Sequence, residues 1–254
     1  MRVVIGRSAV RGAALVAVVL VLAATAAAAG GAARSPSRFQ TLKVVDPLSN
    51  GIEAFRMLVP KGWIWKGGVQ WNLSYANLAS VAMRVRNPRG LEAVESYPLF
   101  PQVWSTATQL GPEGSNYLGS EVRAPLGAPE VLVRLVIPAL RGGRSPTVRS
   151  VVPLPLVVGA LAAIPQDPSL TSSYAAARVR IGYRQGSLLV DEDFYVGLSY
   201  QRSAILPSQT LWQPLFLYSF KAARGSLDRA SQTLQAIVAS VRPSLKWFAG
   251  YQSV

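Results

Sequence analysis

Residues 174–200 read YAAARVRIGYRQGSLLVDEDFYVGLSY, and this stretch decides the fold because it holds the two most recognisable strands of the chain. Runs rich in β-branched and aromatic residues, 174–184 and 187–200, flank the dipeptide Gln185-Gly186. Two such runs on either side of a Gly-containing pair predict an antiparallel β-hairpin with a tight turn.

A two-residue turn at Gln185-Gly186 puts Arg180 opposite Asp191 and Arg178 opposite Asp193 on one face of the hairpin. Opposite charges that face each other on neighbouring strands contribute about 0.2–1 kcal/mol per pair. The other face collects apolar side chains, with Glu192 as the exception. We therefore interpret Asp191 and Asp193 of the acidic trio 191–193 as ion-pair partners for arginine, with a metal or acid–base site as the alternative.

Further strands are predicted on both sides of this hairpin. Residues 52–59 (IEAFRMLV) end at Pro60-Lys61-Gly62, a turn signal, and residues 81–86 alternate with Arg84 and Arg86 on the outer face. One or two strands are expected within 91–104, and another over 211–222, where Pro214 predicts an edge or a bulge.

Helices are expected at three places. One begins at Pro129-Glu130 and stops at Pro138, and a second covers residues 155–164. The third, residues 226–241, is strongly amphipathic and long enough to cross several strands. Because strands and helices do not alternate as a doubly wound sheet requires, we predict an α+β fold with an antiparallel sheet flanked by helices and a long C-terminal amphipathic helix.

Aromatic residues cluster in residues 62–71 (GWIWKGGVQW), which predict a second hairpin around Gly67-Gly68. In that hairpin one face would carry two indole rings beside two amides, a surface suited to stacking on a sugar ring. The candidate ligand surface is Trp63, Trp65, Gln70 and Asn72. The alternative is that both tryptophans belong to the core, because large aromatic side chains usually serve packing.

The chain contains no Cys and no His. Thiol nucleophiles, thiolate zinc sites, disulfides and His-dependent triads are therefore excluded, and we predict no cofactor and no enzymatic activity. Carboxylate chemistry stays open: a secreted hydrolase would need Glu92 and Glu95, or Asp191 and Asp193, in one cleft.

The first 33 residues have the pattern of an export signal. Three arginines precede residues 12–33, an uncharged stretch of Ala, Val, Leu and Gly that ends in several small-residue cleavage choices. The alternative is an uncleaved anchor, because 22 residues of helix span about 33 Å and would contact the membrane. We predict a signal over 1–33, a flexible linker over 34–45 and a single α+β domain over 46–254.

The formal net charge is +14 at pH 7. For an exported protein such a charge favours anionic lipid, an anionic wall polymer or an envelope protein as partner, rather than nucleic acid. Candidate contacts are the cations Arg84, Arg86, Arg141, Arg144 and Arg149. The alternative is that these are ordinary solvated side chains.

Residues 55–63 (FRMLVPKGW), a strand running into Pro-x-Gly-Trp, resemble the opening of PsbP-like domains. The helix over 226–241, with Leu234, Ile237 and Ser240, is similar to the way such domains close, and uncharacterised exported bacterial proteins share both features. The resemblance implies an antiparallel sheet flanked by helices and a non-enzymatic accessory or docking role. Together with the export signal, it predicts a non-catalytic binding or accessory protein outside the cytoplasm, secreted or attached to the cell envelope.

Overall fold

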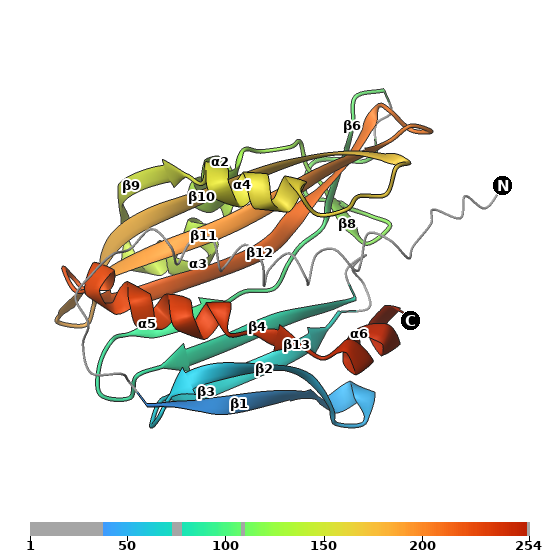
Figure 1. The fold of residues 1–254 in the computed structure, drawn as a ribbon. Helices are drawn as coiled ribbons and strands as arrows, with labels where there is room; N and C mark the ends of the chain where they lie inside the picture. The colour runs from blue at the N-terminus through green and yellow to red at the C-terminus, as the bar shows by residue number, and fades with distance from the viewer. Residues whose placement is uncertain (1–37, 73–77, 108–109, 253–254) are drawn as a thin grey trace.

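The computed structural model describes residues 38–72, 78–107 and 110–252, and the predicted export signal lies outside them. The fold is α+β with mostly antiparallel sheets (Figure 1). The strands are β1 (Phe39–Asp46), β2 (Ile52–Pro60), β3 (Ile64–Trp71), β4 (Ala79–Arg86), β5 (Ala93–Ser96), β6 (Gln102–Ser105), β7 (Asn116–Tyr117), β8 (Ser120–Val122), β9 (Thr147–Pro153), β10 (Leu170–Gln185), β11 (Leu188–Ser203), β12 (Gln209–Ala223) and β13 (Arg242–Pro243). The helical segments are η1 (Pro47–Ser49), α2 (Ala128–Glu130), η2 (Val131–Val136), α3 (Ile137–Arg141), η3 (Gly142–Arg144), α4 (Pro155–Ala162), α5 (Leu227–Ala239) and α6 (Leu245–Gln252).

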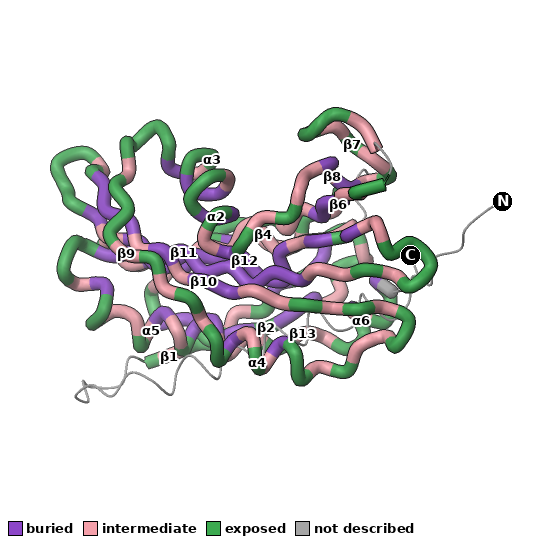
Figure 2. Tube along the Cα trace, turned by 90° about the horizontal axis from the view of Figure 1, so that it is seen from above, coloured by how far each residue is buried: buried purple, intermediate pink, exposed green. Residues whose placement is uncertain are grey.

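The large sheet has the strand order β3-β4-β5-β12-β11-β10-β9, and β6, β7 and β8 attach beside β12. Its central strands are buried on both faces, which Figure 2 shows as a purple band between exposed margins. One face packs on α2, η2 and α3. The other packs on α4, α5, α6 and the small sheet β1-β2-β13. Because helices and a second sheet cover both faces, the middle parts of β11 and β12 are almost continuously buried.

The hairpin β10–β11 forms where the sequence predicts it, but its register differs by two residues. Gln185 pairs with Leu188, so the turn is Gly186-Ser187, and Arg180 faces Asp193 instead of Asp191. Hairpin turns favour glycine at the first central position, where φ is positive, and Gly186 takes that position with φ of 62°. A shift of two residues leaves every side chain on its predicted face because the side-chain period of a strand is two.

Residues 64–71 form one continuous strand, so the predicted hairpin around Gly67-Gly68 is wrong. β3 pairs with β4 without interruption, from Ile64 opposite Arg86 to Trp71 opposite Ala79. Gly67 and Gly68 have φ of 95° and 157°, yet the chain does not turn there. A Cβ on Gly67 would lie 2.2 Å from the carbonyl oxygen of Ala82, so the glycine permits a close approach of β4.

The linker prediction over 34–45 does not hold for residues 39–45, because they belong to β1. β1 pairs with β2 along its whole length, and Val44 is buried between the two sheets. Polar residues of this segment, such as Lys43, alternate with Leu42 and Val44. This period of two fits a half-buried strand. The buried carboxylate of Asp46 ends the strand and caps η1 by accepting a hydrogen bond from the Leu48 backbone N–H at 3.0 Å.

The helix that begins at Ala128 does not stop at Pro138 but runs on to Arg141. The middle segment, η2, is π-helical, with the N–H of Ile137 donating to the carbonyl of Leu132. Pro138 is the second residue of α3 and directly follows this π-helical segment. This continuation carries Arg141 onto the face of the large sheet.

The amphipathic helix α5 is shorter than predicted and is not the last element. It covers Leu227–Ala239, buries Leu227, Leu234, Ile237 and Val238, and is followed by β13 and the eight-residue helix α6. The predicted amphipathic helix is therefore present, but the last helix of the described chain is the short α6, so a long C-terminal helix is not confirmed. Pro243 pairs with Phe55 of β2 and cannot continue a helix, which separates α5 from α6.

Candidate functional site

The densest polar cluster lies inside the fold, between α3 and the large sheet, and is centred on Glu192 of β11. Glu192 is fully buried. Arg141 donates to its two carboxylate oxygens from Nε at 2.8 Å and Nη2 at 2.7 Å. Tyr183 donates to Glu192 at 2.8 Å and Ser219 at 2.6 Å, so the carboxylate accepts four hydrogen bonds.

A second carboxylate, Glu95 of β5, extends the cluster towards the edge of the sheet. Its Oε2 accepts from Arg141 Nη2 at 2.8 Å and from the hydroxyl of Tyr97 at 3.0 Å. Its Oε1 lies 3.0 Å from Arg84 Nε and 3.6 Å from Lys221 Nζ. Two carboxylates and three cations thus form one connected network.

Burial and charge act in opposite directions on the titration of this network. Burial alone would raise the pKa of Glu95, but the positive charges of Arg141, Lys221 and Arg84 hold it below its usual value. Burial lowers the pKa of Lys221, and Glu95 only partly offsets this. Burial and the neighbouring carboxylates raise the pKa of Tyr97. Glu95 is therefore held in its ionised form, and Tyr97 stays neutral and donates a hydrogen bond.

This cluster is not predicted from the sequence patterns, although the predicted hairpin contained a signal for it. In the predicted hairpin Glu192 was the one charge on the apolar face, and a charge in such a position needs a partner. That partner, Arg141, was predicted as a contact for an anionic surface. It is instead buried, and its guanidinium also lies 5.6 Å from the ring centre of Phe194.

The predicted arginine and aspartate residues on the opposite face of the hairpin also lie together. Arg180 binds Asp193 through two hydrogen bonds of 2.7 and 2.9 Å and reaches Asp228 of α5 at 2.6 Å. Arg178 Nη1 is 3.8 Å from Asp193. Asp191, expected to face Arg180, accepts instead from the Gly225 N–H at 2.8 Å and lies 3.6 Å from Arg224.

The predicted sugar-binding residues do not share a face. In the uninterrupted strand β3, Trp65 and Gln70 occupy positions of opposite parity and point to opposite sides. Trp63 packs against the core below the sheet, whereas the side chain of Trp65 is 44% exposed. Asn72 follows the end of β3 and donates its backbone N–H to Leu78.

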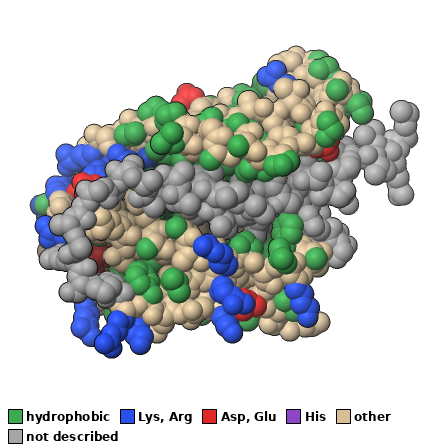
Figure 3. Space-filling view, in the orientation of Figure 1, with side chains coloured by type: hydrophobic (Ala, Val, Ile, Leu, Met, Phe, Trp, Pro, Cys, Tyr) green, Lys and Arg blue, Asp and Glu red, His purple; other side chains and the backbone are tan. Residues whose placement is uncertain are grey.

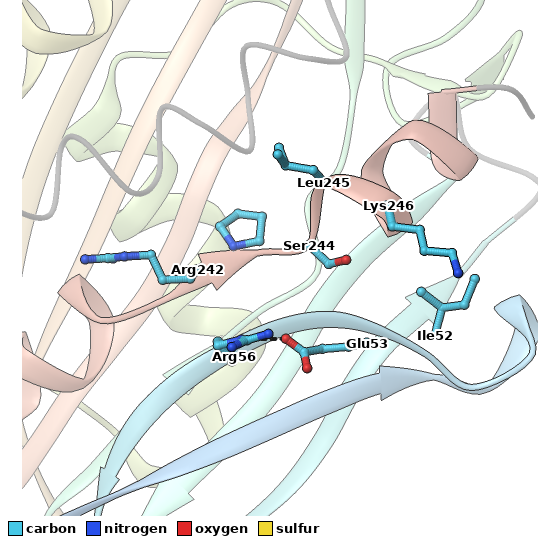
Figure 4. A pocket seen from close by; sticks show the side chains of 8 residues that line it. Ile52, Glu53, Arg56, Arg242, Ser244, Leu245 and Lys246 are labelled. Carbon is cyan, nitrogen blue, oxygen red and sulfur yellow. Dashed lines mark hydrogen bonds and ion pairs between the residues drawn. The ribbon is translucent and has the colours of Figure 1, made fainter.

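A shallow groove of about 660 Å³ lies between β2, β13 and the start of α6. It is lined by Ile52, Glu53, Arg56, Arg242, Pro243, Ser244, Leu245 and Lys246. Arg56 is paired with Glu53 at 2.7 Å, and Arg242 donates to the carbonyls that end α5. Figure 4 shows Arg242 and Lys246 pointing to opposite ends of the groove, so its cations do not converge on one point.

Comparison with known proteins adds no family to this geometry: no protein-family model and no curated protein matches the chain. Within the described ranges, no group of three acidic side chains is placed to bind a metal ion. None of the helices over 38–72, 78–107 and 110–252 has the length and apolarity needed to span a bilayer.

Proposed function

We propose that this chain is an exported, non-enzymatic binding or accessory protein of the cell envelope. The observation that supports it is the state of the carboxylates. Those that a hydrolase would use are all engaged: Glu92 by Asn87 at 2.9 Å, Glu95 by Arg84 and Arg141, Asp191 by Arg224, and Asp193 by Arg180. A general acid or nucleophile has to reach its substrate, and Glu95 and Asp193, which cations hold within the sheet, are poorly placed for this. Glu92 lies in the β4–β5 turn and is bound by the Asn87 amide.

The PsbP-like resemblance belongs to the same proposal. An antiparallel sheet with helices on its faces is compatible with such a domain, and an accessory or docking role is what the resemblance implies. In this role the Glu192 network acts as a rigid support for the outer surface rather than as a reaction centre.

Substitution of Glu192 separates the structural from the catalytic role. In Glu192→Gln the buried guanidinium of Arg141 loses its main counter-charge, and we expect a loss of about 3–5 kcal/mol in unfolding free energy. Glu113→Gln, whose side chain is 60% exposed and paired with Arg123, is the matched control and should change stability by less than about 1 kcal/mol.

Chemical denaturation of the wild-type protein, Glu192→Gln and Glu113→Gln measures this difference in unfolding free energy. The double variant Arg141→Met/Glu192→Leu should recover part of the loss, because an apolar pair can replace a buried ion pair. A catalytic carboxylate would behave in the opposite way: its removal would leave stability unchanged or raise it, since active-site residues are selected for function at the cost of stability. That outcome would contradict the structural role proposed for the Glu192 network.

The cellular part of the proposal is tested by fractionating cells that produce the full chain and sequencing the N-terminus of the recovered protein. Export with cleavage predicts a mature chain that begins shortly after residues 27–33. A retained segment predicts an intact N-terminus in the membrane fraction. Recovery of intact chain from the cytoplasm would contradict the proposal.

Wall-glycan binding is a second candidate, favoured by the exposure of the Trp65 ring at the edge strand β3. Trp65→Ala should then abolish retention on cell-wall glycan while leaving the melting temperature within a few degrees of wild type. Loss of the fold would instead assign Trp65 to packing.

A further inference from the structure

Five turns that are far apart in the sequence meet at one end of the molecule. The registers place Gln185 beside Leu188, Val190 beside Ala223 and Lys221 beside Ala93. Across the next strands, Ala93 of β5 lies beside Arg86 of β4, and Arg86 lies beside Ile64 of β3. On the other side of the hairpin, Thr147 of β9 lies beside Gly182 of β10. The turns at 61–63, 87–92, 142–146, 186–187 and 224–226 therefore share one end, on the left in Figure 1.

This end, which we call the basic end, carries most of the exposed cations of the described chain. They are Arg38, Lys61, Lys66, Arg86, Arg89, Arg144, Arg149, Arg184, Arg224 and Arg229. The acidic residues nearest to them are engaged, with Asp191 bound to Arg224, Asp228 to Arg180 and Glu92 to the Asn87 amide. Figure 3 shows the resulting concentration of Lys and Arg at the left end of that face.

Two of these guanidinium groups converge. A Cβ on Gly182 would lie 2.9 Å from Arg149 Nε and 3.0 Å from Arg224 Nη2, so both groups lie over the same glycine. Like charges held this close repel each other, and an anion between them relieves the repulsion. Asp191 lies 3.6 Å from Arg224 and offsets one of the two charges.

Exposed apolar side chains stand among the cations at this end. Leu188 is 51% exposed at the β10–β11 turn, and Ile64 and Trp65 are each 44% exposed at the start of β3. Cations mixed with Leu and Trp are typical of surfaces that rest in the headgroup layer of a membrane, where an indole ring is at its most stable.

The described chain also begins at this end. Phe39 pairs with Pro60, and the carbonyl of Arg38 accepts a hydrogen bond from Lys61 at 2.7 Å. The apolar segment 12–33 ends five residues before Arg38, a distance that a fully extended chain covers in at most about 18 Å. In the uncleaved-anchor alternative, this short connection keeps the basic end, and not the opposite one, close to the headgroups.

We propose that the basic end is a membrane-docking surface for anionic phospholipid headgroups, with Leu188 and Trp65 entering the interface between the cations. This inference rests on the envelope location given above and adds the partner and the orientation. Each Lys or Arg near an anionic leaflet contributes about fivefold to binding. Neutralising three of them should reduce the equilibrium constant for docking by about a hundredfold.

The test uses the full chain, which has no cysteine of its own, with one cysteine introduced by Leu188→Cys or by Ile205→Cys. Ile205 is 83% exposed in the β11–β12 turn at the opposite end. Each protein carries a polarity-sensitive fluorophore and is reconstituted into vesicles of phosphatidylcholine alone or mixed with phosphatidylglycerol. We expect a blue shift only for the probe at 188, only in the anionic vesicles, and less of it at high salt.

Charge variants complete the design. Lys61→Gln/Arg89→Gln/Arg184→Gln should abolish the blue shift, and the matched triple Lys43→Gln/Arg202→Gln/Lys246→Gln, away from the basic end, should keep it. Equal shifts at both probes, a shift without anionic lipid, or no effect of the first triple would overturn the inference. Complete suppression of the blue shift by inorganic phosphate would also overturn the inference, because it would identify a soluble anion as the ligand.

The comparison of the probes at positions 188 and 205, in chains that keep all their cations, tests the docking surface even where the triple variant fails to fold. The outcome is also separable from the envelope location. A cytoplasmic result in fractionation refutes export whatever the probes show, while an exported chain without a shift at 188 refutes only the docking surface.

Discussion

The carboxylate of Asp46 is fully buried and serves as the acceptor that joins three parts of the fold. Trp71 of β3 donates its indole N–H at 2.9 Å, Trp247 of α6 donates at 2.7 Å, and Ser49 donates its hydroxyl at 2.7 Å. Burial would raise the pKa of Asp46, but the hydrogen bonds from Trp247, Ser49 and Trp71 outweigh it and lower the pKa below its ordinary value of 3.8.

This shift predicts how stability depends on pH. A carboxylate whose pKa is lower in the folded than in the unfolded chain contributes stability that is complete above the unfolded value and disappears as pH falls through the folded value. We expect unfolding free energy to decline below about pH 4 and to decline less steeply in Asp46→Asn. Urea denaturation at several pH values measures both curves, and parallel curves would show that Asp46 does not contribute.

At the scale of elements, the pairing of β11 with β12 depends on one glycine. The register of the two strands shifts between Gly197 and Leu198, opposite the segment that contains Pro214. This bulge is the feature that Pro214 predicts. A Cβ on Gly197 would lie 2.3 Å from the ring of Phe216, which is itself buried, so no side chain fits there without displacing the ring.

Gly197→Ala should therefore destabilise the protein by about 1–3 kcal/mol, the usual cost of overpacking a core. Gly159→Ala is the control, because α4 leaves open space around that glycine and alanine favours a helix by about 0.5–1 kcal/mol. Thermal melting of both variants should show a lower midpoint for the first and an equal or higher one for the second. Adding Phe216→Leu to Gly197→Ala should restore part of the loss.

At the scale of the whole molecule, the cations gathered at the basic end repel one another. Lys61→Gln/Arg89→Gln/Arg184→Gln should melt at a higher temperature than wild type in dilute buffer. The difference should shrink as salt rises and the Debye length falls to about 8–10 Å. The Lys43/Arg202/Lys246 triple, spread over other surfaces, should show a smaller gain. Equal gains for the two triples would mean that the charge of the basic end is not locally concentrated.

Local patterns were sufficient for much of the architecture. Alternation of apolar and polar residues located β2, β4, β10 and β11, and the Gly and Pro signals located most of their turns, because these features depend on neighbours in the chain. The extent of the helix at 128–141 could not be predicted in this way. Pro138 ends an ordinary helix, and it is the π-helical turn packed on the large sheet that lets the chain continue.

The sequence by itself determined the α+β class, the excess of positive charge and the chemistry that an absence of Cys and His excludes. Only the tertiary structure decided that Arg141 is buried against Glu192 while Arg149 and Arg224 stay outside over Gly182. It also decided that five separate turns meet where Arg38 begins the described chain. Both outcomes depend on contacts between residues far apart in sequence, and strand order and register set those contacts, which no local pattern encodes.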